Sequence, residues 1–309
     1  MSISKDSGNA QPSPIFSPEP CSPTADPANV GELLSELRAL VATLPNFRPN
    51  PDPDYLLRFL RAKKYNVRKA FHSYRTLHGT RLTLPDVYQP RGAGTKEVID
   101  VFELRACAIL PQLNPSDNTF VAIVRVGDWN PSSGVNLDRA ITPILLVGHV
   151  LLSSPIVQLN GGRIVFDMRK SSITFARHFN MSAIKTILAL ANGGYPCRLR
   201  GFHILYDNAA FRFFFNILKP FLRAEVVRRV HLHGDRLSSL HDHIDPDILP
   251  GEYGGKAGEF PWQILRDEMV RRHESFVELS WFGYQVGGAE ENTNEHAQNG
   301  SHLPATTPS

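Results

Sequence analysis

The sequence contains little cysteine and no long apolar run. Its three cysteines, Cys21, Cys107 and Cys197, are odd in number and widely spaced among 309 residues, so they do not define a disulfide framework. Thiols without such a framework indicate a reducing, intracellular environment. No stretch approaches about 18 uninterrupted apolar residues, and the N-terminal region lacks the basic start and apolar run of a signal peptide. We therefore expect a cytoplasmic protein.

The sequence also lacks the common catalytic signatures. It has no nucleophile elbow, no zinc-protease helix and no paired-cysteine metal spacing, and the segment Gly92 to Lys96 lacks the gap between glycines that defines a phosphate loop. Asp167 ends a strand without a partner at a chemically useful spacing, so we expect it to bond the backbone or a basic neighbour. We predict that the protein is not an enzyme and needs no cofactor.

Histidines form the one constellation that could support chemistry. The run HLHGDRLSSLHDH holds four of them within thirteen residues: His231, His233, His241 and His243. Histidines at positions i and i+2 of a strand share a face and could bind Zn²⁺ or Fe²⁺. The simpler interpretation, which we prefer, is that His231 and His233 are polar residues at the end of a strand. A metalloenzyme acting on a hydrophobic substrate stays as an alternative, and we predict no metal.

Composition divides the chain into five parts. With 42% apolar and 20% charged residues the chain is globular overall, but residues 1–29 are rich in Ser, Pro and Asn and are expected to be a disordered tail. Residues 30–84 carry the periodicity of three helices and predict an N-terminal helical domain, in which Asp52 caps a helix that opens with Pro53. The main domain is expected over 85–258, a C-terminal helical segment over 259–285, and a second disordered tail over 286–309.

The main domain carries the pattern of a mostly parallel sheet. Arg163 to Met168 and Gly201 to Asp207 are apolar on both alternating faces, which is typical of strands buried on both sides. Between them, Ser182 to Asn192 has apolar residues at helical spacing. A strand, a helix and a strand in this order predict a crossover with parallel strands. Thr119 to Val126 predicts an earlier strand, and Ile141 to Leu152 predicts an apolar helix.

The segment Asn208 to Leu222 is a predicted helix that is apolar on nearly all faces and holds five phenylalanines. One interpretation is a buried helix; the other is a mobile helix that covers a cavity and meets a membrane when it opens. Between Pro196 and Arg236 eight Lys or Arg residues stand against three acids, a formal charge of +5 compared with +3 for the whole chain. Nucleic acid would match the charge but not the phenylalanines, whereas anionic lipid matches both.

Six motifs occur in one order between about Pro53 and Gly255: YLLRFLRAKKYNVRKA, RVGDWNP, NGGRIVFDM, YPCRLRGFHILYD, ILKPFL with RRVHLHG, and DILPGEYGG. In order and spacing they resemble the CRAL-TRIO (Sec14-like) lipid-transfer family, and most closely its tocopherol-transfer and retinaldehyde-binding branch. The resemblance implies an α/β fold with an N-terminal three-helix bundle and a CRAL-TRIO lipid-binding domain. In that domain a mostly parallel sheet floors a closed apolar pocket, and a mobile helical gate opens on membranes.

The resemblance also implies site residues. Those expected to line the lipid pocket are Ile141, Ile144, Leu145, Gly148, Phe166, Ile187, Leu190, Tyr195, Cys197, Leu199 and Phe202. The gate segment, Asn208 to Leu222, contributes Phe211, Phe214, Phe215, Leu218, Phe221 and Leu222. Arg198 and Arg229 match branch residues that meet a phosphoinositide headgroup. Arg58 or Arg61 could join them from the lead-in helix, and Lys219, Arg223 and Arg228 are their neighbours.

Several positions depart from the branch. Ile144 and Gly148 stand where the tocopherol binder has two pocket serines, Arg169-Lys170 replaces an acid-Gly pair after the strand, and Glu225 replaces a basic residue. The loss of two hydroxyls predicts a drier pocket of different shape, so the ligand is expected to be a tocopherol, a retinoid or a phospholipid-like molecule.

The sequence therefore predicts a non-enzymatic, cytoplasmic lipid-binding and transfer protein. Its expected partners are one hydrophobic ligand and, transiently, the surface of phosphoinositide-containing membranes; no nucleic acid is expected. The alternatives are a lipid-regulated sensor or scaffold that transfers nothing, and the His-cluster metalloenzyme.

Overall fold

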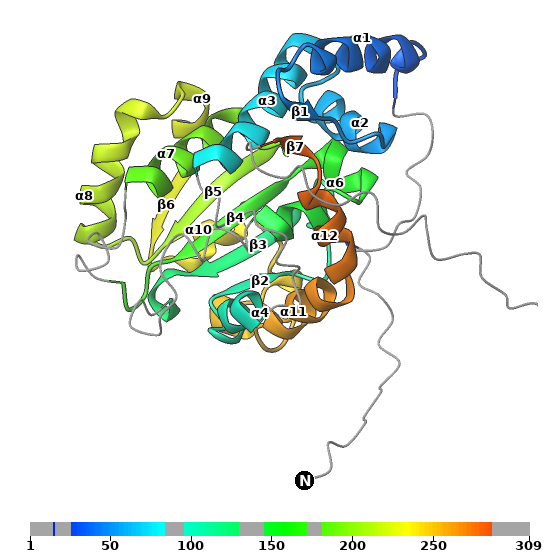
Figure 1. Cartoon of the computed structure of the whole chain (residues 1–309). Coiled ribbons are helices and arrows are strands. Elements are labelled where there is room, and N and C mark those ends of the chain that lie inside the picture. The colour runs from blue at the N-terminus through cyan, green and yellow to red at the C-terminus, as the bar shows by residue number, and fades with distance from the viewer. Residues whose placement is uncertain (1–14, 16–25, 84–95, 130–144, 172–180, 286–309) are drawn as a thin grey trace, which may run out of the picture.

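The computed structural model describes residues 15, 26–83, 96–129, 145–171 and 181–285 (Figure 1). The predicted disordered tails and the expected pocket residues Ile141 and Ile144 lie outside the described residues, apart from Ile15 and residues 26–29.

Three helices form a bundle at one end of the molecule: α1 (Val30–Ala42), α2 (Pro53–Ala62) and α3 (Val67–Thr83) (Figure 1). The Asp52 carboxylate accepts a hydrogen bond from the backbone N–H of Asp54 at 2.9 Å and Pro53 opens α2, as predicted. Apolar side chains from all three helices, among them Leu37, Phe59 and Tyr74, share one core. The short strand β1 (Phe47–Arg48) follows α1 and pairs antiparallel with β7 (Gly283–Tyr284).

A five-stranded sheet lies at the centre of the molecule. Its strands are β2 (Cys107–Ile109), β3 (Phe120–Arg125), β4 (Gly162–Asp167), β5 (Leu199–Leu205) and β6 (Val230–Gly234), in that spatial order. β2 is antiparallel to β3 and the other neighbours are parallel, which confirms the predicted mostly parallel sheet. Between β4 and β5 lie α7 (Met181–Ala189) and the π-helical turn η6 (Leu190–Gly194), where Gly193 has a φ of 103° that glycine adopts without steric cost.

Apolar layers cover both faces of the sheet. Phe120 and Ala122 of β3 belong to a core with Val150, which lies on the helix over residues 145–151. The alternate residues Val121 and Ile123 belong to a second core on the other face, which includes α10 (Leu237–His241). Because side chains alternate along a strand, the two-sided apolar pattern of these strands places one core on each side of the sheet.

Shorter elements complete the layers. α4 (Lys96–Glu103) lies beside α11 (Trp262–Arg271) near β2, and α12 (His273–Ser280) leads back toward β7 (Figure 1). η3 (Val126–Asp128) follows β3, α6 (Pro155–Asn160) precedes β4, and η8 (Pro246–Ile248) and η9 (Gly251–Tyr253) follow α10. Among the helices that the structure describes, none is long and apolar enough to cross a membrane.

The gate segment lies beyond β6 at one edge of the sheet (Figure 1). It forms α8 (Ala209–Leu218) and the 3-10 turn η7 (Lys219–Phe221), and α9 (Ala224–Val227) follows. The α-helix gives way to the 3-10 turn beside Pro220, whose missing N–H cannot continue the helical bonding. No side chain of α8, which is described throughout, is buried, and Phe213, Ile217 and Phe221 are 57%, 49% and 65% exposed. The interpretation of this segment as a buried helix is therefore wrong.

Candidate functional site

An apolar surface on the two central strands forms the candidate site. Ile164 and Phe166 of β4 share a face with Phe202 of β5, which is the register partner of Ile164, and all three remain partly accessible. On the opposite face, Val165 and Leu205 have no accessible surface. Central strands with helices on both sides are normally buried on both faces. The apolar residues Ile164, Phe166 and Phe202 are accessible where Val165 and Leu205 are not, which indicates that the protein's own side chains do not completely fill the space above this face.

Two of the other residues expected to line the pocket, Cys197 and Leu199, pack against the same core as Ile164. Cys197 and Leu199 contact the core that contains Val150 and Leu151 of the helix over residues 145–151. Leu145 of the same helix is buried. Ile187 and Leu190 lie half-buried on α7 and η6. Burial raises the pKa of the Cys197 thiol to about 12, so the thiol stays protonated at neutral pH.

Gly148 and Tyr195 meet across this surface. A Cβ atom added at Gly148 would overlap the Tyr195 hydroxyl and ring, so only glycine lets the phenol lie against the helix. The hydroxyl oxygen of Tyr195 lies 3.4 Å from the carbonyl oxygen of Leu145. The hydroxyl that sequence comparison predicts to be missing at position 148 is therefore replaced, in nearly the same space, by a phenol from the opposite side.

Two asparagines fasten the ends of the gate segment. The Asn208 side chain accepts from the N–H of Phe211 at 2.9 Å and donates to the Ser171 hydroxyl at 2.9 Å, which ties the start of α8 to the turn after β4. The Asn192 side chain donates to the carbonyl of Phe221 and accepts from the N–H of Arg223, both at 2.8 Å. The gate segment is thus held by side-chain hydrogen bonds at each end, while Phe213 and Ile217 between them are exposed.

The predicted basic residues have different surroundings. Arg61 makes a two-pronged ion pair with Asp26, at 2.9 and 2.6 Å, and donates to Gln158 at 2.6 Å. Arg198 donates to the backbone carbonyls of Leu159, Ala62 and Arg61, and Arg229 donates to that of Leu199 at 2.8 Å. Lys219, Arg223 and Arg228 are exposed. Arg58 is half-buried, as Arg61 and Arg198 are, and its Nη1 lies 3.1 Å from Nδ1 of His149.

Lys63 joins this basic group although the sequence did not single it out. Its ammonium donates to the carbonyl of Gly193 at 2.8 Å. Burial, and then the neighbouring Arg223, lower the pKa of Lys63 to about 8. Within the described parts of the chain, Lys63, Arg198, Arg223 and Arg229 form no ion pair with an acid. We call these four residues the basic cluster, a group of cations without acidic partners beside the gate segment. The sequence signal for Lys63 was its place as the second basic residue of the motif RAKK.

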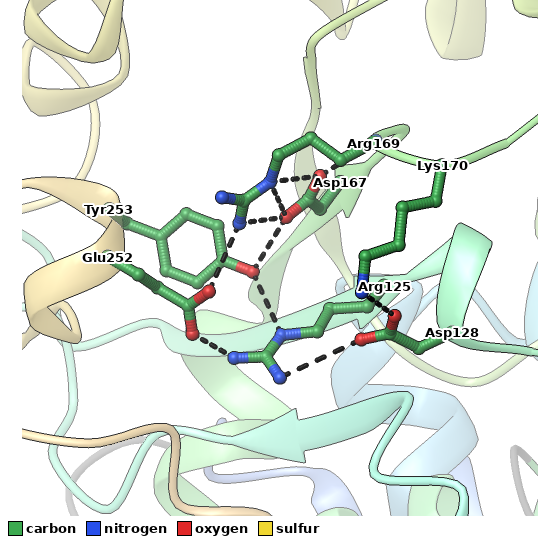
Figure 2. A network of polar contacts seen from close by, with 7 residues as sticks. All are labelled: Arg125, Asp128, Asp167, Arg169, Lys170, Glu252 and Tyr253. Atoms are coloured by element: carbon green, nitrogen blue, oxygen red, sulfur yellow. Dashed lines mark hydrogen bonds and ion pairs between the residues drawn. The ribbon is translucent and has the colours of Figure 1, made fainter.

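A polar network closes the carboxyl ends of β3 and β4 (Figure 2). Asp167 accepts from the backbone N–H of Arg169 at 2.9 Å, from its guanidinium, and from the Tyr253 hydroxyl at 3.0 Å, as expected of a carboxylate that bonds backbone and a basic neighbour. Glu252 pairs with both Arg125 and Arg169. Burial, and then the Asp167 charge, raise the pKa of Tyr253 to about 12. With every charge paired, the network joins β3, β4 and η9 and leaves no group available as a general base.

Four imidazoles gather on the sheet face opposite the accessible apolar surface. His203 of β5 stacks on His231 of β6 at 5.0 Å between ring centroids, and its Nδ1 lies 3.0 Å from Nε2 of His233. His243 completes this histidine cluster, 4.5 Å from His231. His241 instead bonds the carbonyl of Tyr253 at 2.9 Å. Sequence reasoning missed His203, whose signal was a lone histidine within an apolar strand.

The histidine cluster gives no support to a metal centre. The His203 ring stacks on those of His231 and His233 at interplanar angles of 12° and 17°, and the His243 ring is tilted by 49° from that of His203. Across the described residues, no group of three or more His, Cys, Asp or Glu side chains is arranged to hold an ion.

Comparison with known proteins places the chain in a family. The CRAL/TRIO domain model matches residues 111–255. The mouse protein named alpha-tocopherol transfer protein-like is 33% identical over 227 residues, 73% of this chain, and the match spans 65% of that protein's length. The human protein of that name is 31% identical, and the match covers 75% of this chain and 67% of that protein. Human clavesin-2 is 25% identical, and the match covers 74% of this chain and 70% of clavesin-2. The chain belongs to the CRAL/TRIO domain family.

Proposed function

We propose that the protein binds one hydrophobic molecule against the accessible apolar face of β4 and β5 and carries it between membranes without catalysis. The observation that carries this proposal is the partial accessibility of Ile164, Phe166 and Phe202 on strands whose apolar residues Val165 and Leu205, on the other face, have no accessible surface. The name of the mouse and human relatives makes a tocopherol one candidate ligand. A retinoid or a phospholipid-like molecule would suit the same apolar surface.

The size of the hydrophobic effect explains why such a carrier needs a gate. Enclosing a long lipid removes on the order of 400 Å² of apolar surface from water, worth roughly 10 kcal/mol at about 25 cal/mol per Å². A ligand held this strongly leaves slowly unless the walls open. The gate segment is the element suited to opening, because it is attached through Asn192 and Asn208 and none of its α8 side chains is buried.

Membrane docking would supply the energy for opening. Phe213, Ile217 and Phe221 are exposed apolar side chains beside the cations Lys219, Arg223 and Arg228. Each Lys or Arg near an anionic bilayer contributes about 1 kcal/mol. A phosphoinositide headgroup at the basic cluster would favour the open gate by binding it more tightly than the closed one. In this proposal the protein is cytoplasmic and visits the membrane transiently.

The test combines native mass spectrometry with a transfer assay. We expect protein purified from a eukaryotic host to carry one hydrophobic molecule per chain, which organic extraction identifies. It should move that molecule between vesicles faster when the acceptor contains phosphoinositide. Replacing Phe213 and Phe221 with serine should slow transfer without removing the bound ligand, whereas the control Lys256→Ala, which removes an exposed cation elsewhere, should not. Binding without transfer would identify a sensor or scaffold, and an empty protein that takes up no lipid would refute the carrier.

A further inference from the structure

Arg58 is a charged side chain turned into the protein. It lies on α2 between the buried residues Leu57 and Phe59. Its Nη1 lies 3.1 Å from Nδ1 of His149, on the helix over residues 145–151, and its guanidinium carbon lies 5.4 Å from the centre of the Tyr55 ring. Its Nε is buried and has no hydrogen-bond partner among the described residues. A guanidinium has five N–H donors in a fixed fork, so one contact with a neutral imidazole leaves most of its bonding capacity unused.

The charge of Arg58 is also not neutralised. No acid of the described chain makes an ion pair with it, and Asp52 and Asp54, on the exposed first turn of α2, act on it only through space. Arg61, one turn later on the same helix, shows the usual solution, because it holds the Asp26 carboxylate through two hydrogen bonds. Burial lowers the pKa of Arg58, which reflects the cost of a cation removed from water without a partner. A half-buried guanidinium with a buried, unpartnered Nε and no acidic partner is a feature found where a ligand supplies the missing partner.

The neighbours of Arg58 are neutral, and they connect it to the apolar surface. Because Arg58 can only donate, Nδ1 of His149 must accept, so the ring proton of a neutral His149 lies on Nε2. The Tyr195 hydroxyl interacts electrostatically with Arg58 and lies over Gly148, the residue next to His149. Tyr195 in turn precedes Cys197 and Leu199, which border the accessible apolar face. One polar corner, made of Arg58, His149 and Tyr195, thus adjoins the proposed lipid surface.

From this geometry we infer that Arg58 binds the anionic head of an amphiphilic ligand, with the Tyr195 hydroxyl beside it and the hydrocarbon chain along β4 and β5. A carboxylate or a phosphate monoester matches the forked donors of a guanidinium and supplies the charge that the corner lacks. The inference rests on the proposed carrier function and adds that the cargo is an acid, not a neutral alcohol or ester.

The test compares ligands that differ only in the head. The full chain is titrated with oleate, oleyl phosphate and oleyl alcohol below their critical concentrations, with bound ligand counted by native mass spectrometry. We expect at least one of the two acids to bind tenfold or more tightly than the alcohol, and the stronger of them identifies carboxylate or phosphate as the head. Arg58→Gln should remove the preference. The matched control Arg68→Gln, which removes an exposed cation from the neighbouring helix α3, should keep it.

A second variant protects the test against a folding defect in Arg58→Gln. His149→Glu places a carboxylate opposite Arg58, so we expect a melting temperature no lower than that of the wild type together with loss of the preference for acids. Equal binding of the alcohol and both acids by the wild type, or an undiminished preference in His149→Glu, would overturn the inference while leaving the carrier function intact. Failure of the folded protein to bind any of the three would count against both.

Discussion

Acidification to about pH 5 should destabilise the protein through the histidine cluster. His203 and His233 are 1% and 4% exposed. Burial, and then the neighbouring His243, lower the pKa of His203 to about 2 and that of His233 to about 4, from an ordinary value of 6.5. Folding therefore favours the neutral form of both rings.

The sign and size of the effect follow from linkage. Below about pH 6.5 the unfolded chain binds protons on these two histidines that the folded chain does not. The free energy of unfolding is therefore unaffected by them above that pH, and it decreases as the pH drops from about 6.5 toward the folded pKa values. At pH 5 each ring costs roughly 2 kcal/mol, and the two together about 4 kcal/mol, a large part of a typical stability.

The charges around the cluster do not cancel this cost. Arg163 and Arg236 lower the pKa of cluster histidines and would repel protonated rings. The one acid acting on His233, Asp207, is engaged by Arg212 at 2.7 Å and by the N–H of Gly234 at 2.9 Å. Hydrogen bonds and ion pairing lower the pKa of the Asp26 and Asp117 carboxyls from 3.8, so their contributions are lost only below about pH 4, in a separate window.

Urea unfolding at several pH values between about 7.5 and 5 tests this reasoning. The wild type should lose stability steeply below pH 6.5, and the double variant His203→Gln with His233→Gln should show a much flatter profile. The control His241→Gln removes a histidine that bonds the carbonyl of Tyr253 outside the cluster, and the steep loss of stability that the cluster causes should persist in it. A wild-type stability that is constant over this range, or a slope that survives in the double variant, would refute the assignment.

Two further predictions concern the gate and the basic cluster. Asn192→Ala removes two hydrogen bonds from the end of the gate segment, worth about 1 kcal/mol each. Release of a bound fluorescent lipid, measured by stopped-flow, should therefore become several-fold faster or more. An unchanged release rate would show that opening occurs elsewhere. Because the folded pKa of Lys63 is about 8, its charge is lost as the pH rises through that value. The amount of protein that sediments with phosphoinositide vesicles should therefore decrease between about pH 7 and 9. Lys63→Arg should remove this pH dependence, and a dependence that persists in the variant would exclude Lys63 as its source.

The sequence predicted the sheet well because its signals are local. Two-sided apolar runs at Arg163 to Met168 and Gly201 to Asp207 required strands with layers on both faces, and the helix between them required parallel pairing. The Asp52 cap followed from residue type alone.

The sequence could not predict contacts between distant segments. The pairing of Asn192 with Phe221 joins residues 29 positions apart, and Lys63 reaches Gly193 across 130 positions. A list of basic residues likewise could not separate Arg61, which has the Asp26 carboxylate, from Arg58, which has no acid, because that difference depends on where the chain returns.

The pairing of β1 with β7 has a consequence for synthesis on the ribosome. Phe47 and Tyr284 are register partners with rings in edge contact at 5.0 Å, so the first strand waits for 237 residues (284 − 47) before its neighbour exists. At about 5 to 20 residues per second, that interval is roughly 10 to 50 s. During this interval Phe47, whose ring contacts those of Tyr74 and His78, lacks its contact with Tyr284. The nascent N-terminal helices therefore keep the Phe47 ring without its β7 partner until Tyr284 has been synthesised.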